Sequence, residues 1–250
     1  MKTYVLVGAG VRALHMFAKP MASEWKDAIR FRGIYDINPV RAKLAAEECG
    51  VPAYDDFGRM LKETRPDVVI VASTDATHHE YIIKSLEAGC DVVTEKPMTI
   101  DEEKCRAILL AERASGKKVT VTFNLRYAPY FAKVKELLQN GAIGRVTHID
   151  FEWFLDRRHG ADYFRRWHAE MKNSGGLLVH KSTHHFDIVN WWMNSRPAVV
   201  HAFGTRVKYG GGREGRGERC LTCGLKSSCE FYMDIESNPF MEKYYRGAEH

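Results

Sequence analysis

Three histidines, one lysine and one aspartate lie within eight residues of each other, between His180 and Asp187. An imidazole can take up a proton near neutral pH, bind a metal ion, or lie buried in a core. If this segment is helical, His180, His184 and Asp187 share one face, because they are four and three residues apart. Zinc is disfavoured, since Lys181 stands where a HExxH motif has its glutamate and would repel a cation. The segment therefore favours acid–base chemistry.

A second chemical motif is the pair Gly8 and Gly10, between an apolar run and a helix-like pattern. Glycines at such a junction let the backbone approach a pyrophosphate at the N-terminus of the helix. Asp36 ends the next predicted strand, where a carboxylate would bind the adenosine ribose hydroxyls and repel a 2′-phosphate. Arg41 lies nearby and opposes that repulsion. The motif predicts a dinucleotide site that favours NAD over NADP.

Two further predicted strands end in polar residues, at Ser73–His79 and Thr94–Pro97. Ligands of open α/β sheets lie at these carboxyl ends of the strands. Lys96 follows one strand directly and precedes a proline, so we expect it to reach the nicotinamide end of the cofactor. The other expected cofactor contacts are Val11, Arg12, Ser73, Thr74, His78, Glu95 and Asn124.

The first half of the chain alternates between strand and helix patterns. Strands are expected at 3–10, 29–36, 67–73, 91–97 and 119–124, and helices at 11–22, 39–50, 55–66, 78–90 and 101–117. Strict alternation predicts a doubly wound parallel sheet with right-handed crossovers. We assign residues 1–122 to a Rossmann dinucleotide-binding domain.

The pattern changes in the second half, which we assign to an α/β domain of residues 123–250. Residues 145–156 alternate like a half-exposed strand, 174–194 read as a turn followed by a helix, and 198–210 read as another strand. Near the end, Cys220, Cys223 and Cys229 form a compact set of thiols. With a fourth ligand such as His201 or His250 they could hold a structural zinc ion; the alternative is free or redox-labile thiols.

The bulk composition excludes some classes of protein. The 250 residues are 45% hydrophobic and 28% charged, with a formal net charge of +5 and dispersed basic groups, so nucleic-acid binding is not expected. No apolar run approaches the roughly 20 residues that span a bilayer. We expect a cytoplasmic protein.

In chain order, the glycine turn, Asp36, "STDATH", "TEKP", "FNLRYAP", "GAIGRVTHI" and "SGGLLVHKSTHHFD" resemble the glucose–fructose oxidoreductase / inositol dehydrogenase / MocA (Gfo/Idh/MocA) family. The resemblance covers residues 1 to about 205. It implies a Rossmann domain followed by an α/β domain with a large open, mainly antiparallel sheet. It also implies a homodimer or homotetramer assembled through the second domain. Family members commonly run past 300 residues, so the chain looks C-terminally truncated.

The resemblance also implies NAD(P)-dependent hydride transfer at a hydroxyl carbon of a sugar, cyclitol or related molecule. Lys96 and His184 match the family's catalytic lysine and histidine, and His180 stands where an aspartate is usual. We expect His184 to take the hydroxyl proton, Lys96 to orient the oxygen, and His180 to relay protons or bind substrate. The expected substrate contacts are Arg126, Tyr163, Trp167, Lys181 and Asp187.

Two other functions stay open. A related branch, which Arg12 and the "HKSTHHFD" segment resemble, contains redox-neutral glycosidases that oxidise a sugar transiently with bound NAD. A non-catalytic NAD-binding regulatory protein is the alternative from another class.

Overall fold

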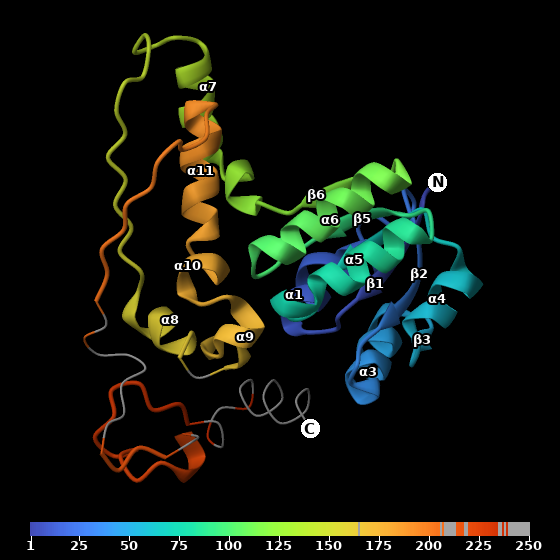
Figure 1. Ribbon diagram of the computed structural model, residues 1–250. Helices are drawn as coiled ribbons and strands as arrows, with labels where there is room; N and C mark the ends of the chain where they lie inside the picture. Colours follow the sequence, from blue (N-terminus) through green and yellow to red (C-terminus); the bar gives the residue numbers. More distant parts are fainter. Residues whose placement is uncertain are drawn as a thin grey trace. The chain divides into compact units, whose positions relative to one another are not determined.

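The computed structural model describes residues 1–164, 166–205, 207, 214–217, 220–234, 237 and 239. The chain divides into two compact units, and the boundary between them falls between Thr122 and Phe123. The first unit holds residues 1–122 together with the described residues from Asp234 onward, and the second holds residues 123–233 (Figure 1).

A six-stranded parallel sheet forms the centre of the first unit. Its strand order is β3-β2-β1-β4-β5-β6, which is the classic dinucleotide-binding order. The strands are β1 (Thr3–Val7), β2 (Arg30–Tyr35), β3 (Ala53–Tyr54), β4 (Val68–Val71), β5 (Asp91–Thr94) and β6 (Val119–Val121). The doubly wound fold and the five expected strands are confirmed; β3 was not expected, because two residues are too few for a periodic pattern.

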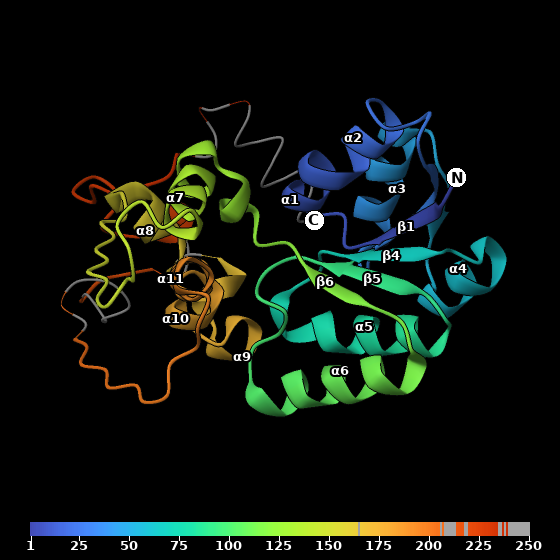
Figure 2. The ribbon, with the colours of Figure 1, turned by 90° about the horizontal axis from the view of Figure 1, so that it is seen from above.

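Helices cover both faces of this sheet (Figure 2). They are α1 (Val11–Ala13), the π-helix η1 (Leu14–Ala18), α2 (Lys19–Ala22), α3 (Pro39–Cys49), α4 (Phe57–Thr64), the 3-10 helix η2 (Asp75–Thr77), α5 (His78–Glu87) and α6 (Glu102–Ser115). Alternate β1 side chains face opposite layers: Leu6 packs with residues of α1–α3, while Val5 and Val7 pack with residues of α4–α6. This two-sided burial explains the continuous apolar run of β1.

The first helical segment differs from the uninterrupted helix that the sequence predicts over residues 11–22. Its middle turn is π-helical, with the Lys19 N–H donating to the carbonyl of Leu14. Pro20 accounts for this change, because it has no N–H and its ring would clash with the carbonyl four residues earlier.

In the part of the second unit that the structure describes, all regular secondary structure is helical, and irregular segments connect the helices. Its elements are the 3-10 helix η3 (Asn124–Tyr127), α7 (Pro129–Gln139), α8 (Arg157–Asp162), the 3-10 helix η4 (Trp167–Ala169), α9 (Met171–Ser174), α10 (Leu177–His180), α11 (Thr183–Met193) and the 3-10 helix η5 (Cys220–Thr222). Helices α7 and α11 lie side by side (Figure 1). The Trp192 indole donates to the Phe131 carbonyl at 3.1 Å, and Ile188 is fully buried.

The described residues of this unit do not form the open antiparallel sheet that the sequence predicts. Residues 146–156 and 197–205 are irregular, and no described residue of the unit belongs to a strand. Alternation of apolar residues marks which side chains share a face, but a strand also needs a hydrogen-bonded neighbour. Neither segment has such a neighbour among the described residues. Residues 206 and 208–210 of the second expected strand lie outside the described residues.

The sequence predicts one helix after Gly175 and Gly176, but the structure has two. Helix α10 ends at His180 and α11 begins at Thr183. The Ser182 N–H donates to the carbonyl of Leu177, five residues back, and this shifts the hydrogen-bonding ladder. Serine and threonine compete for backbone hydrogen bonds, which favours such a break. His180 therefore lies on a different helix from His184 and Asp187.

No helix in the described part of the chain combines the length and the apolar character needed to cross a bilayer.

Candidate functional site

The glycine turn after β1 has the geometry that a dinucleotide requires. Gly8 has φ +93°, and a Cβ atom there would lie 2.5 Å from the carbonyl oxygen of Ala72. Gly10 caps the first helical segment with φ −65°, and a Cβ there would meet no atom within 4 Å. Gly8 thus permits close packing of the β1 and β4 ends, while Gly10 faces open space where a ligand can approach the backbone.

Asp36 lies directly beside this turn. Its Oδ2 accepts the N–H of Ala9 at 2.7 Å, and its Oδ1 accepts the N–H of Asn38 at 2.8 Å. The carboxylate is buried, and the nearest guanidinium nitrogen of Arg41 is 3.9 Å away. Asp36 therefore joins the ends of β1 and β2, and Arg41 partly offsets its negative charge.

Lys96 lies at the end of β5 in a loop that is tied to the glycine turn. The Lys96 N–H donates to Oε2 of Glu95 at 3.1 Å, and Oε1 of Glu95 accepts from Nε of Arg12 at 2.9 Å. Glu95 is buried, whereas about half of the Arg12 side chain is exposed. Arg12, Glu95 and Lys96, all predicted cofactor contacts, therefore form one connected chain at the carboxyl edge of the sheet. Val11 begins α1 beside them.

His78 differs from its predicted role as a cofactor contact. Its side chain has no exposed surface; Nδ1 lies 2.9 Å from the carbonyl oxygen of Pro97 and Nε2 lies 3.1 Å from that of Ser73. Both ring nitrogens are occupied by backbone, so His78 links the loops that follow β4 and β5. In the same turn, Ser73 Oγ lies 2.9 Å from Thr77 Oγ1, and the Thr74 carbonyl accepts from Thr77.

In the second unit, Arg126 and Asp187 bind each other. Nε of Arg126 donates to Oδ2 of Asp187 at 2.7 Å, and Nη2 donates to Oδ1. The guanidinium also lies 5.7 Å from the ring centres of Phe123 and Trp191. The hydrogen bonds to Asp187 raise the pKa of Arg126. Arg126 and Asp187, both expected substrate contacts, therefore fix η3 on α11. Asn124, also on η3, has a buried Oδ1 that meets no hydrogen-bond donor among the described residues.

His184, the predicted base, is buried on α11, three residues before Asp187. Its ring meets the ring of Phe123 edge-on at 6.2 Å. Phe123 thus touches both the histidine and the guanidinium that holds α11, a contact that sequence reasoning missed.

His180 belongs to a different group, which we call the His180 cluster: His159, Asp162, Tyr163, Trp167, His168, His180 and Lys181. The ring of His180 lies 5.4 Å from Tyr163, 5.3 Å from Trp167 and 5.1 Å from His168. His159 Nε2 lies 3.1 Å from the Tyr163 hydroxyl. The structure thus brings together three predicted substrate residues with His180.

Sequence reasoning missed His159, Asp162 and His168 in this cluster. Part of the signal was present, since His159 lies on α8 and Tyr163 follows it by four residues, directly after the helix ends. Nε2 of His168 lies 3.6 Å from Oδ2 of Asp162.

Burial and charge shift the pKa values of this cluster. Burial lowers the pKa of Lys181, and burial together with Lys181 lowers the pKa of His159. Burial and the Asp162 carboxylate raise the pKa of Tyr163 to about 12. The ammonium of Lys181 therefore lies close to ionisable rings, and no carboxylate in the described part of the chain contributes to its pKa.

The predicted zinc site has no geometric support. No group of three or more His, Cys, Asp or Glu side chains within the described ranges is arranged to hold a metal ion. Cys220, Cys223 and Cys229 form no disulfide. The Gly217 N–H lies 3.4 Å from Sγ of Cys223, and this bond with one from Leu225 lowers the pKa of the thiol. Sequence spacing placed the thiols near one another but could not fix the directions of their side chains; His250 lies outside the described residues.

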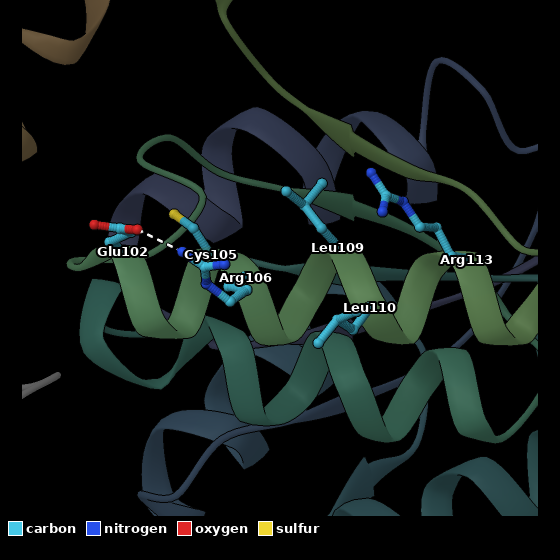
Figure 3. A pocket seen from close by; sticks show the side chains of 6 residues that line it. All are labelled: Glu102, Cys105, Arg106, Leu109, Leu110 and Arg113. Atoms are coloured by element: carbon cyan, nitrogen blue, oxygen red, sulfur yellow. Dashed lines mark hydrogen bonds and ion pairs between the residues drawn. The ribbon is translucent and has the colours of Figure 1, made fainter.

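One pocket lies on the surface of α6 (Figure 3). It measures about 450 Å³ and is lined by Glu102, Cys105, Arg106, Leu109, Leu110 and Arg113. Leu109 and Leu110 are largely exposed, and none of the predicted site residues lines the pocket. It is an open apolar surface with no group placed for catalysis.

Comparison with known proteins identifies the family. Residues 2–123 match the model of the oxidoreductase family with an NAD-binding Rossmann fold (Gfo/Idh/MocA), and residues 135–235 match the C-terminal alpha/beta domain of the same family. The chain belongs to the Gfo/Idh/MocA oxidoreductase family, as its motifs predicted, and its first unit is an NAD-binding Rossmann domain.

Among particular relatives, the chain is 43% identical over 244 residues to "Putative oxidoreductase YteT" of Bacillus subtilis (strain 168), covering 93% of this chain and 57% of that protein. It is 25% identical over 193 residues to an inositol 2-dehydrogenase/D-chiro-inositol 3-dehydrogenase of Lactiplantibacillus plantarum, covering 76% of this chain and 51% of the relative. The crystal structure of apo scyllo-inositol dehydrogenase from Lactobacillus casei superposes with a TM-score of 0.65 at 24% identity, covering 78% and 55% of the two chains. The chain thus spans about half the length of the relatives it matches.

Proposed function

We propose that this protein is an NAD-dependent oxidoreductase that transfers hydride between nicotinamide and a hydroxyl carbon of a sugar, cyclitol or related molecule. The observation that carries the proposal is the edge of the Rossmann sheet, where the glycine turn, Asp36 and the Glu95–Lys96 loop follow neighbouring strands. A glycine turn alone would suit a non-catalytic NAD-binding regulatory protein. Lys96 at the same edge of the sheet favours an enzyme, because its side chain can take part in the reaction.

The residues present fit a dinucleotide. The space beside Gly10 is open, so a ligand can approach the backbone there, and the backbone N–H groups at the start of the helical segment suit a pyrophosphate. Arg12, with half of its side chain exposed, supplies a positive charge next to that turn. Ser73 and Thr74 follow the end of β4. Asn124, in the second unit, stays a predicted cofactor contact.

When bound, the cofactor would supply the hydride acceptor or donor. Lys96 would donate a hydrogen bond to the substrate oxygen and stabilise the negative charge that develops on it. His184 would accept the hydroxyl proton, since imidazole is suited to proton transfer near neutrality. Asp187, held by Arg126, would keep the helix of His184 in place.

The preference for NAD rests on Asp36. A buried carboxylate at the end of β2 disfavours the 2′-phosphate of NADP, although Arg41 at 3.9 Å reduces that effect. The substrate class is supported by relatives that are named as inositol dehydrogenases. Assembly as a homodimer or homotetramer through the second unit stays a prediction, which light scattering would test.

The test is a panel of cyclitols, aldoses and aryl glycosides incubated with NAD⁺. NADH is followed at 340 nm and the released aglycone is measured in parallel. We expect NADH to accumulate with at least one polyol, and both Lys96→Ala and His184→Ala to lower the rate at least a hundredfold. The matched controls are Lys62→Ala and His148→Ala, which remove exposed side chains of the same types.

Release of aglycone without net NADH would show the redox-neutral glycosidase instead. Wild-type turnover in Lys96→Ala and His184→Ala would refute the assigned residues. Binding of NAD⁺ with no turnover of any compound would favour the regulatory alternative.

A further inference from the structure

The His180 cluster combines aromatic rings with an excess of basic groups. Its basic side chains are His159, His168, His180 and Lys181, and Arg166 lies beside it; among the described residues, the acids that face these groups are Asp156 and Asp162. Asp162 is shared, because Nη1 of Arg166 lies 3.5 Å and Nε2 of His168 lies 3.6 Å from the same oxygen. Asp156 accepts the backbone N–H of His159 at the start of α8. In the part of the chain that the structure describes, basic side chains therefore outnumber carboxylates around this cluster.

Lys181 is the least compensated of these groups. It is half-buried, and its pKa is lowered by burial, with no carboxylate contributing. Its charge lowers the pKa of both His159 and His185, so it lies near these two rings. A partly desolvated ammonium without an acid among the described residues gains most from an anionic ligand.

A second observation concerns His168. It is 8% exposed, and its Nδ1 meets no hydrogen-bond partner among the described residues. A buried polar atom of this kind costs free energy unless a ligand or water satisfies it. The ring of His168 lies 5.1 Å from those of both His180 and Tyr163, so the unsatisfied atom belongs to this cluster.

The aromatic residues of the His180 cluster indicate the chemistry of the rest of the anionic ligand. Tyr163 and Trp167 are both half-buried and meet the ring of His180 edge-on, so each keeps part of its surface exposed. Aromatic surfaces next to hydrogen-bonding groups suit a ligand that has both C–H faces and hydroxyls, as a pyranose does. A phosphate or a metal ion would use only the polar groups, and no metal-binding arrangement exists among the described residues.

We propose that the His180 cluster binds an acidic sugar, with Lys181 and the neighbouring imidazoles receiving its carboxylate and Tyr163 and Trp167 receiving its ring. This inference rests on the proposed function, because it names the substrate class of that enzyme.

The experiment titrates the protein with sodium D-glucuronate and, separately, with D-glucose at constant ionic strength and pH 7. Calorimetry measures affinity, and histidine ring C–H signals in NMR spectra report contact. We expect glucuronate to bind at least tenfold more tightly than glucose and to shift the signals of His168 and His180. Lys181→Met should weaken glucuronate binding at least tenfold, whereas Lys172→Met, which removes an exposed lysine on α9, should not change it. Circular dichroism confirms that both variants are folded.

Equal affinity for glucose and glucuronate would overturn the proposal, as would wild-type glucuronate binding by Lys181→Met. Equal competition by sodium acetate would also overturn it, by showing an anion site without sugar recognition. A parallel titration with NAD⁺ distinguishes failure of this proposal from failure of the proposed function. If the protein binds NAD⁺ but not glucuronate, only the acidic-sugar proposal is refuted.

Discussion

The guanidinium of Arg126 donates two hydrogen bonds to the carboxylate of Asp187, and this pair joins η3 to α11. Only 9% of the Asp187 side chain is exposed, compared with 39% of Arg126. Phe123 and Trp191 flank the guanidinium at 5.7 Å. The pair therefore holds the helix that carries His184 against the segment that follows the Rossmann domain in the sequence.

Replacing Arg126 alone should lower the free energy of unfolding more than replacing Arg126 and Asp187 together. Arg126→Met leaves the buried Asp187 carboxylate without its counter-ion, and we expect the free energy of unfolding to fall by about 2 kcal/mol after allowance for the exposure of the arginine. The double variant Arg126→Met, Asp187→Leu should recover part of that loss. Urea denaturation measures both. Equal stability of the wild type and Arg126→Met would show that the pair contributes nothing.

Gly8 tests the backbone geometry of the turn. A Cβ at this position would lie 2.5 Å from the Ala72 carbonyl oxygen, and φ is +93°. Gly8→Ala should therefore lower the free energy of unfolding by roughly 2 kcal/mol or more. Gly50→Ala is the matched control, because it also has positive φ but its Cβ would meet no atom within 4 Å. If both variants lose the same stability, the close contact with β4 is unimportant.

Asp36 and Arg41 should change cofactor preference in opposite directions. Asp36→Asn removes the charge that disfavours a 2′-phosphate, so the ratio of the Kd for NADP⁺ to that for NAD⁺ should fall at least tenfold. Arg41→Gln removes the offsetting cation at 3.9 Å and should raise the same ratio. Calorimetry with both dinucleotides gives the ratios. An unchanged ratio in Asp36→Asn would contradict the role given to Asp36.

His185 should make stability depend on pH. Burial and the charge of Lys181 lower its pKa below the ordinary value of 6.5. Above 6.5 both folded and unfolded chains carry the neutral ring. As the pH falls below 6.5, the unfolded chain takes up a proton before the folded one, so stability is lost until the folded pKa is reached.

The thermal midpoint should therefore fall between pH 7.5 and 5.5, and the fall should be smaller in His185→Phe. Phenylalanine keeps the ring contact with Trp153, where the centres are 4.6 Å apart. His148→Phe, at an exposed position, is the control and should retain the wild-type dependence. Identical pH curves for the wild type and His185→Phe would contradict this assignment.

The Rossmann unit could be predicted from the sequence because its information is local. Apolar runs, Asn38 and Pro39 at the start of α3, and Gly50 at its end each specify structure within a few residues. Even there, Pro20 turned a predicted helix into a π-helical segment. The second unit depends on pairings distant in sequence, and alternation at 146–156 did not reveal whether a neighbouring strand exists.

The candidate site shows the same division. The turn at Gly8 and Gly10, Asp36 and Lys96 follow strand ends, so their common edge could be derived. The pairing of Arg126 with Asp187 spans 61 residues, and His78 is buried between two loops, so neither arrangement follows from residue type or spacing.

The proposed binding of NAD depends first on the turn at Gly10. The most direct measurement is calorimetric titration of NAD⁺ into the wild type and Gly10→Ala. A Cβ at Gly10 contacts no protein atom and φ is −65°, so the variant should fold with an unchanged thermal midpoint. We expect a single NAD⁺ site in the wild type and an affinity at least tenfold lower in Gly10→Ala. No NAD⁺ binding by the wild type, or equal affinity in both proteins, would contradict it.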